Sequence, residues 1–222
     1  FPMGGKTQST PEVASVAKIP VLSPKETSTT SIMAYGFDPL VAQWSPWHGA
    51  QVAVLESLAK IVSVGGSLET TRLSFQEYFE RTDSPETWGK PTAALLGALD
   101  AQKTMEIPSI GGKDSMSGNF DDLKVPPALI SFAFSSSDEE NLISGAFKQG
   151  DSYVYAAIQA YTEMLAPDFD AFKENYAHIK NALKEENILS MYPVGAGGIS
   201  EAISKMSFGN EIGCTIENGV QE

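Results

Sequence analysis

The feature that most constrains the fold is a helical pattern with a broad buried face over residues 49–64. Its apolar positions recur at helical spacing: Val52, Leu55, Ala59 and Val62, with Val54, Leu58 and Ile61 beside them. Gly65 and Gly66 then end the segment, as glycines commonly do after a helix. A second decisive segment, residues 128–134, is an apolar run rich in β-formers between two prolines and a serine cluster, which predicts a buried strand.

The rest of the chain mixes helical and strand patterns. Residues 92–105 predict a helix with Pro91 near its first turn, and residues 169–186 and 198–206 predict two more. Strands are expected at 153–158 and 212–216. This mixture predicts an α/β class with a two-layer (α+β) arrangement. We expect a linker or loosely packed lead-in at 1–30, a first unit at 31–136, and an incomplete second unit at 137–222.

Net charge limits the function classes. Of 222 residues, 28 are acidic and 15 are Lys or Arg, so the formal net charge is −13. Such a surface repels phosphate backbones and anionic lipid, so we expect neither nucleic-acid nor membrane binding. The single cysteine, Cys214, excludes an internal disulfide and fits a cytoplasmic protein. A chain that starts at Phe1 without an apolar leader is expected to be a piece of a longer polypeptide.

The densest polar chemistry lies in the run Ile110-Gly-Gly-Lys-Asp-Ser-Met-Ser-Gly118. It follows a short apolar segment, and we expect it to be a loop at the end of a strand, where binding groups usually lie. It is not a phosphate-binding P-loop, because Asp114 follows the lysine and Ile107 stands where the first glycine is required. Two interpretations stay open: a polar cluster facing a phosphate or carboxylate, or a surface turn whose Asp and Ser bond their own backbone.

Other candidates have simple structural explanations. His48, within Trp44-Ser-Pro-Trp-His-Gly49, is either a catalytic imidazole or part of an aromatic anchor at a helix entrance, and the anchor is favoured. Glu56 and Lys60 have the i, i+4 spacing of a helix-surface ion pair, although Glu56 is also a possible magnesium ligand. The Phe75–Arg81 segment is expected to pack its aromatics. Residues 194–198 could cradle an anion or allow close backbone packing, His178 is expected to be solvated, and Cys214 is expected in a buried strand.

Several runs together resemble the formylglycinamidine ribonucleotide synthetase (phosphoribosylformylglycinamidine synthase) family. They are Trp44–Gly49, Leu73–Arg81, Trp88–Ala98, Ile110–Gly118, Val125–Ala133, Val194–Ala202 and Phe208–Asn210. The resemblance covers roughly residues 26–216 and is to the second of the family's two duplicated synthetase halves. It implies a fold similar to aminoimidazole ribonucleotide synthetase, with an ATP-binding-like first subdomain followed by a truncated C-terminal subdomain.

The resemblance also implies a chemistry. In the family, ATP activates the formamide oxygen of formylglycinamide ribonucleotide, and ammonia from a glutaminase part displaces phosphate to give the amidine. Magnesium neutralises the transferring phosphoryl group. The implied cofactors are therefore ATP and Mg, and the implied partners are nucleotides and the remaining domains of the parent synthetase, including its glutaminase. In relatives of this fold the first subdomains pair to build a barrel, so self-association into a homodimer is also expected.

The family's site residues transfer only in part. Lys113, Asp114 and Ser115, with Gly111 and Gly112, match the family run and are the expected nucleotide- or substrate-binding residues. Glu56 matches a magnesium-binding glutamate. The asparagine expected four residues later is Lys60, and an expected Asp and Ser are replaced by Pro193 and Gly195. No catalytic residue is identified.

Three hypotheses follow from the sequence. The first is a part of the ATP-dependent carbon–nitrogen ligase of purine synthesis, inactive in isolation. The second is a degenerate, non-catalytic half that supports the active half, which the losses at Lys60, Pro193 and Gly195 favour. The third is another ATP-using enzyme of the same superfamily.

Overall fold

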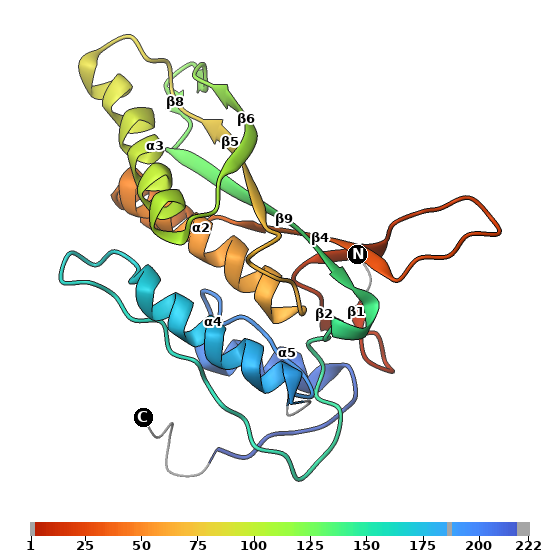
Figure 1. The fold of residues 1–222 in the computed structure, drawn as a ribbon. Helices are drawn as coiled ribbons and strands as arrows, with labels where there is room; N and C mark the ends of the chain where they lie inside the picture. Colours follow the sequence, from red (N-terminus) through yellow and green to blue (C-terminus); the bar gives the residue numbers. More distant parts are fainter. Residues whose placement is uncertain (1–2, 186–187, 217–222) are drawn as a thin grey trace.

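A mixed five-stranded sheet forms the centre of the protein. The computed structural model describes residues 3–185 and 188–216. The strands β3 (Ser15–Lys18), β4 (Thr29–Gly36), β9 (Ala128–Asp138), β5 (Arg72–Tyr78) and β6 (Ser109–Ser115) lie side by side in that order (Figure 1). All neighbours are antiparallel except β5 and β6, which are parallel and are connected through a helix. The predicted α/β class is confirmed.

Three helices lie on one side of this sheet: α1 (Pro39–Trp44), α2 (Pro46–Ser63) and α3 (Pro85–Met105). The long α2 packs on β9 and β4, and α3 packs alongside α2 (Figure 1). Serine caps fix both long helices. Ser45 accepts a hydrogen bond from the backbone of His48 at the start of α2, and Ser84 forms a reciprocal capping box with Thr87 at the start of α3.

The hydrophobic core lies between the sheet and these helices. Strand β4 alternates, so Ile32 and Ala34 face inward while Met33 and Tyr35 face outward. Gly97 of α3 lets the two long helices approach closely, because a Cβ there would lie 2.2 Å from the carbonyl oxygen of Trp47. The largest fully buried apolar side chains come from both layers: Ile32, Val54, Leu58, Ile61, Leu73 and Phe79.

The later part of the chain adds a second group of helices, α4 (Phe169–Lys184) and α5 (Gly198–Phe208), below the first layer in Figure 1. Helix α4 joins the main core through Phe169 and Phe172. Tyr176 accepts a hydrogen bond from the Leu68 amide at 3.2 Å and donates one to Glu69 at 2.7 Å. Smaller elements are η1 (Glu139–Asn141) and the two-stranded pairs β1 (Met3–Gly4) with β2 (Thr10–Pro11) and β7 (Asn119–Phe120) with β8 (Leu123–Lys124).

Most of the predicted helices and the 128–134 strand are confirmed. Helix α3 begins at Pro85, seven residues before the predicted start, so Pro91 lies inside the helix rather than near its first turn. Glu186, the last residue of a predicted helix, lies outside the described residues. The lead-in also differs from the prediction, since β1, β2 and β3 form within it and Thr10 is fully buried.

The two strands predicted at 153–158 and 212–216 are wrong. Tyr153 and Tyr155 are exposed in a segment without regular secondary structure, and neither region pairs with a neighbouring strand in the described part of the chain. A β-rich composition forms a strand only where a partner supplies the ladder, and these segments have none. Cys214 is accordingly exposed and not in a strand. Within residues 3–185 and 188–216, no helix combines the length and the apolar character that crossing a bilayer requires.

Candidate functional site

The Gly111–Ser115 run is a strand, which corrects the prediction of a loop. It forms most of β6, in parallel register with β5 from Ser74 opposite Gly111 to Tyr78 opposite Ser115. Residues 109–114 are exposed because β6 is the last strand of the sheet. The predicted polar residues therefore lie along an open sheet edge, near the carboxyl ends of two parallel strands, where ligands of open α/β sheets commonly bind.

Strand geometry separates these residues into two sets. Successive side chains of a strand point to opposite faces, so Asp114 lies on one face of β6 and Lys113 and Ser115 lie on the other. The ammonium of Lys113 donates to the backbone oxygen of Asp114 at 3.3 Å. Position 112 requires a glycine, because a Cβ there would lie 2.8 Å from the carbonyl oxygen of Phe75. At position 111 a Cβ would make only an ordinary contact, 4.0 Å from the Ser74 hydroxyl oxygen.

Glu77 lies directly beside Asp114 on the neighbouring strand. Its exposed fraction is 1%, and its Oε2 atom has no hydrogen-bond partner among the described residues. Burial raises the pKa of Glu77 to about 7, and the negative charge of Asp114 adds to the effect. The alternation of side chains along β5 explains the burial of Glu77, because every second residue from Leu73 through Phe75 to Glu77 points to the buried face of the sheet.

A second polar group follows β5 at Glu80. Its exposed fraction is 3%, and Lys90 of α3 and Lys124 of β8 both form ion pairs with it, the latter at 2.9 Å. Hydrogen bonds from Lys90 and then Lys124 lower the pKa of Glu80. These three side chains line a hollow of about 300 Å³, with Gln43, Pro46 and residues 125–127. The ion pairs join the segment after β5 to α3 and β8, at the end of the sheet that also carries Ser115.

Glu56 is not arranged to bind magnesium. Its Oε1 atom lies 2.7 Å from the Lys60 ammonium, and its Oε2 atom accepts a hydrogen bond from the Phe37 amide at 2.8 Å. Lys60 also donates to the carbonyl oxygen of Tyr35 at 2.8 Å and lies over the Tyr35 ring. The ion-pair interpretation of this i, i+4 spacing is confirmed. Both carboxylate oxygens are already engaged, so the donor set does not fit a metal ion here.

The remaining candidates have local structural roles. The His48 ring bonds the Ser45 hydroxyl at 2.7 Å and the Met164 carbonyl at 2.8 Å and contacts both Trp44 and Trp47, which confirms the anchor. The Gly197 amide donates to Glu201 at 2.9 Å, so a carboxylate of the chain itself takes that amide. His178 is exposed, as predicted. Residues 3–185 and 188–216 contain no group of three His, Cys, Asp or Glu side chains suited to a metal ion.

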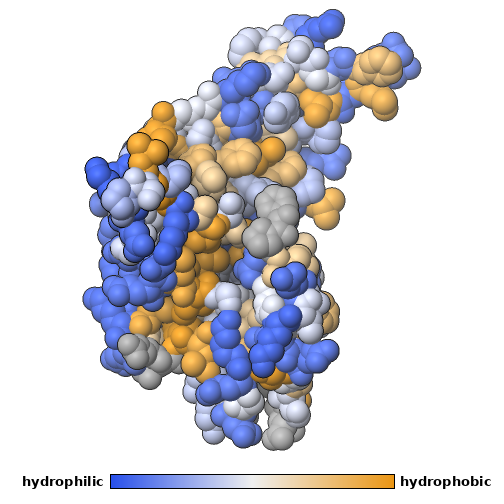
Figure 2. Space-filling model, turned by 90° about the vertical axis from the view of Figure 1, so that its right-hand side faces the viewer, coloured by the Kyte–Doolittle hydropathy of each residue, from blue (hydrophilic) through white to orange (hydrophobic). Residues whose placement is uncertain are grey.

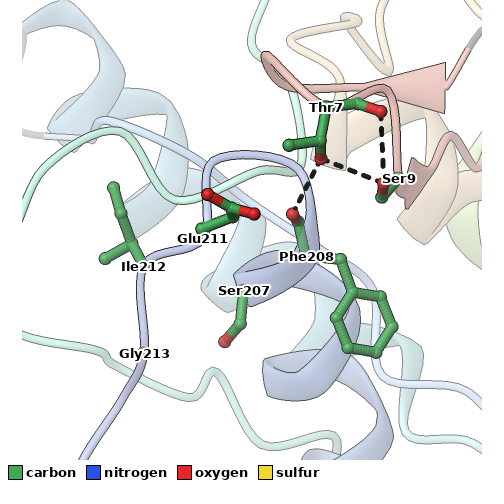
Figure 3. Close-up of a pocket in the computed structure, with 7 residues that line it drawn as sticks. All are labelled: Thr7, Ser9, Ser207, Phe208, Glu211, Ile212 and Gly213. Atoms are coloured by element: carbon green, nitrogen blue, oxygen red, sulfur yellow. Dashed lines mark hydrogen bonds between the residues drawn. The ribbon is translucent and has the colours of Figure 1, made fainter.

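Another hollow lies away from the sheet edge, between the β1–β2 turn and the end of α5 (Figure 3). Its volume is about 460 Å³. Thr7 donates to the Phe208 carbonyl at 3.0 Å and to the Ser9 hydroxyl at 2.9 Å, which ties the turn to the helix. Glu211 is the one ionisable side chain in the described lining, which holds no cation for a phosphate. This hollow is therefore not a candidate for the predicted nucleotide.

Sequence reasoning missed Glu77, Glu80 and Lys124. Glu77 carried a usable signal, because it occupies the position in the alternating Leu73, Phe75, Glu77 series where an apolar residue is expected. Glu80 and Lys124 are far apart in the sequence and meet only through the fold. The aromatic packing expected in the Phe75–Arg81 segment is confirmed for Phe75 and Phe79, both of which are buried.

Comparison with known proteins identifies PurL subunits among the similar sequences. The phosphoribosylformylglycinamidine synthase subunit PurL of Methanocaldococcus jannaschii is 24% identical over 197 residues, which cover 78% of this chain and 27% of the relative. The PurL subunit of Thermoplasma acidophilum is 21% identical over 215 residues, covering 89% of this chain and 28% of the relative. No family model matches the chain. The chain spans about a quarter of the length of the curated relatives it matches.

Solved structures of Thermotoga maritima PurL share the fold. The PurL complexed with ATP superposes with a TM-score of 0.66 at 17% identity, covering 87% of this chain and 30% of that chain. The PurL complexed with FGAR superposes with a TM-score of 0.59 at 14% identity, covering 81% and 32%.

Proposed function

We propose that this chain, which is PurL-like in sequence and fold, is part of an ATP-dependent ligase that converts formylglycinamide ribonucleotide to formylglycinamidine ribonucleotide in purine synthesis. The observation that carries the proposal is the extent of the match to the PurL complexed with ATP, which covers 87% of this chain. The Gly111–Ser115 run, which lies on an open sheet edge, supplies the candidate binding residues. A ligand can reach this edge because residues 109–114 are exposed.

The nucleotide is proposed to bind along this edge. Lys113 supplies a positive charge for phosphate oxygens, Ser115 a hydroxyl, and Asp114 a carboxylate on the other face of the strand. Magnesium, when bound to ATP, neutralises phosphate charge. Glu56 is not proposed to hold that ion, because Lys60 already pairs with it.

The outer face of the sheet supports a role for a partner domain. Met33, Tyr35 and Tyr78 are exposed on the strands, and the Tyr35 and Phe132 rings lie 6.4 Å apart. Figure 2 also shows hydrophobic residues exposed on one side of the molecule. A protein of this size rarely leaves a contiguous apolar patch open unless another surface covers it. We propose that the other half of the parent synthetase covers this face, and that a second copy replaces it in a homodimer of the isolated chain.

The remaining assignments follow from the same proposal. Residues 31–136 are the ATP-binding-like unit, residues 137–222 are the opening part of the next unit, and residues 1–30 lead in to the first. The glutaminase that supplies ammonia is a partner of the whole enzyme, and the cytoplasm is the expected location. Sedimentation at micromolar concentration tests the pairing: a monomer that persists as the concentration rises would contradict it.

A second candidate function is a non-catalytic half that supports an active partner. The Glu56–Lys60 ion pair favours it, because an ammonium occupies the position where the family resemblance implies a metal-bound nucleotide. Micromolar binding of Mg-ADP that Glu56→Ala abolishes would contradict this alternative.

Isothermal titration with Mg-ATP tests the main proposal. We expect binding that weakens about tenfold in Lys113→Ala, since a charge-assisted phosphate contact is lost. Lys25→Ala, which removes an exposed lysine from the loop between β3 and β4, is the matched control and should bind like the wild type. Absence of binding in the wild type, or equal affinities in the two variants, would contradict the nucleotide site.

A turnover assay tests separately whether catalysis requires the other parts of the proposed parent synthetase. With formylglycinamide ribonucleotide, ATP and ammonia, the chain alone is expected to release no ADP above background, because it spans about a quarter of its relatives. Sustained ADP release would show that the chain is catalytically complete.

A further inference from the structure

Glu77 is a buried carboxyl group whose surroundings do not account for it. Its exposed fraction is 1%, Oε2 has no hydrogen-bond partner in the described part of the chain, and no ion pair is formed there. An unpaired carboxylate is expensive to bury, and a strand position in phase with Leu73 and Phe75 would ordinarily carry an apolar side chain. A glutamate here is explained most directly by something that it binds.

Asp114 is the acidic residue that faces Glu77 on the neighbouring strand. It lies opposite Glu77 in the parallel register of β5 and β6, so both side chains project from the same face of the sheet. Neighbouring strands are about 4.8 Å apart, which places the two carboxyl groups within reach of one ion. The electrostatic effect of Asp114 on the pKa of Glu77 is consistent with this closeness.

The two carboxyl groups have no cation of the protein between them. Neither forms an ion pair within residues 3–185 and 188–216, and the adjacent Lys113 lies on the opposite face of β6. Glu56 and Glu80 are different, since lysines pair with each of them. Among these carboxylates, the Glu77–Asp114 pair is the one that the described residues leave without a counterion.

We propose that Glu77 and Asp114 together bind a divalent cation of the magnesium class at the edge of the sheet. Hard cations take oxygen ligands, and magnesium is commonly held by one or two carboxylates with water or phosphate oxygens in the remaining positions. Two protein ligands are therefore enough, and the exposed side of Asp114 leaves room for the other oxygens. The site deepens the proposed function, since it would place a cation beside the residues proposed to bind the nucleotide.

Manganese binding to the complete chain tests this site without any nucleotide. Free Mn²⁺ is measured by electron paramagnetic resonance during a titration of the wild type, Glu77→Gln and Asp114→Asn. We expect each substitution to weaken binding by at least about tenfold, the size of change typical for disrupted metal sites. Asp122→Asn, in the exposed turn between β7 and β8, is the matched control and should leave the affinity unchanged. Circular dichroism verifies that each variant is folded.

The outcomes separate the two proposals. Absence of Mn²⁺ binding in the wild type, or equal affinity in the wild type and Glu77→Gln, would overturn the cation site. Mn²⁺ binding with the expected losses, in a chain that does not bind ATP, would support the cation site and contradict the nucleotide proposal. If Glu77→Gln binds both the nucleotide and Mn²⁺ as tightly as the wild type does, the result would support the nucleotide proposal and contradict the cation site.

Discussion

Replacing Glu77 by Gln should change how stability depends on pH, and the structure gives the sign and the size. Burial raises the pKa of Glu77 to about 7, with Asp114 adding to the shift, whereas an unfolded glutamate titrates near its ordinary value of 4.5. Between these values the folded protein binds more protons at this position than the unfolded chain. The free energy of unfolding therefore falls as pH rises through this window.

The magnitude follows from the difference between the two pKa values. A rise from 4.5 to about 7 corresponds to at most about 3 kcal/mol of stability lost above neutral pH. Glutamine keeps nearly the same shape but does not ionise, so the variant lacks this loss. Whatever hydrogen bond its amide gains or misses adds a contribution that does not vary with pH.

Urea unfolding of both proteins from about pH 5 to pH 8, with a chelator to remove metal ions, measures the effect. The stability of Glu77→Gln relative to the wild type should rise by about 2 to 3 kcal/mol over this range. Taking the difference cancels the titration of all other groups. A difference that stays constant with pH would refute the argument, because it would mean that Glu77 titrates alike in the folded and unfolded chains.

Three further predictions concern stability. Lys180→Ala should weaken the docking of α4, because Lys180 pairs with Glu69. Burial raises the pKa of Glu69, but hydrogen bonds, led by the one from Lys180, lower it to about 2. The stabilisation from these bonds is therefore present above pH 4.5 and lost toward pH 2, which acid unfolding of the wild type and the variant would show. Phe79→Ala removes a side chain that is 1% exposed and should cost about 3 to 5 kcal/mol in urea unfolding. Gly112→Ala should cost about 1 to 3 kcal/mol by thermal unfolding, and Gly111→Ala far less, because only the Cβ at 112 meets backbone of β5.

Periodicity predicted the parts of the fold that have strong local patterns. The apolar face of α2 and the run of β9 are both local signals, and both elements form where expected. The strand predicted at 153–158 failed because a strand needs a neighbour, and no local pattern shows whether one exists. The early start of α3 depends on the Ser84 capping box with Thr87, a signal present in the sequence but not used.

The candidate site was predictable in composition but not in geometry. The run at 111–115 stands out for its polar density, but two glycines before a lysine indicate a loop, and only the pairing of β5 with β6 makes the run a strand. Pairing decides which groups converge. It separates Lys113 from Asp114, which are adjacent in the sequence, and joins Asp114 to Glu77, which is distant.

The edge position of β6 gives its charged residues a second physical role, which has to be distinguished from ligand binding. An exposed edge strand offers unpaired backbone groups to other chains, and charged side chains such as Lys113 and Asp114 discourage that pairing. Edge protection, however, requires only charge at the surface. It does not require a carboxyl group at Glu77, which is buried on the adjacent strand and cannot meet an approaching chain. The buried partner is therefore the feature that separates the two roles, and it favours a ligand at this edge.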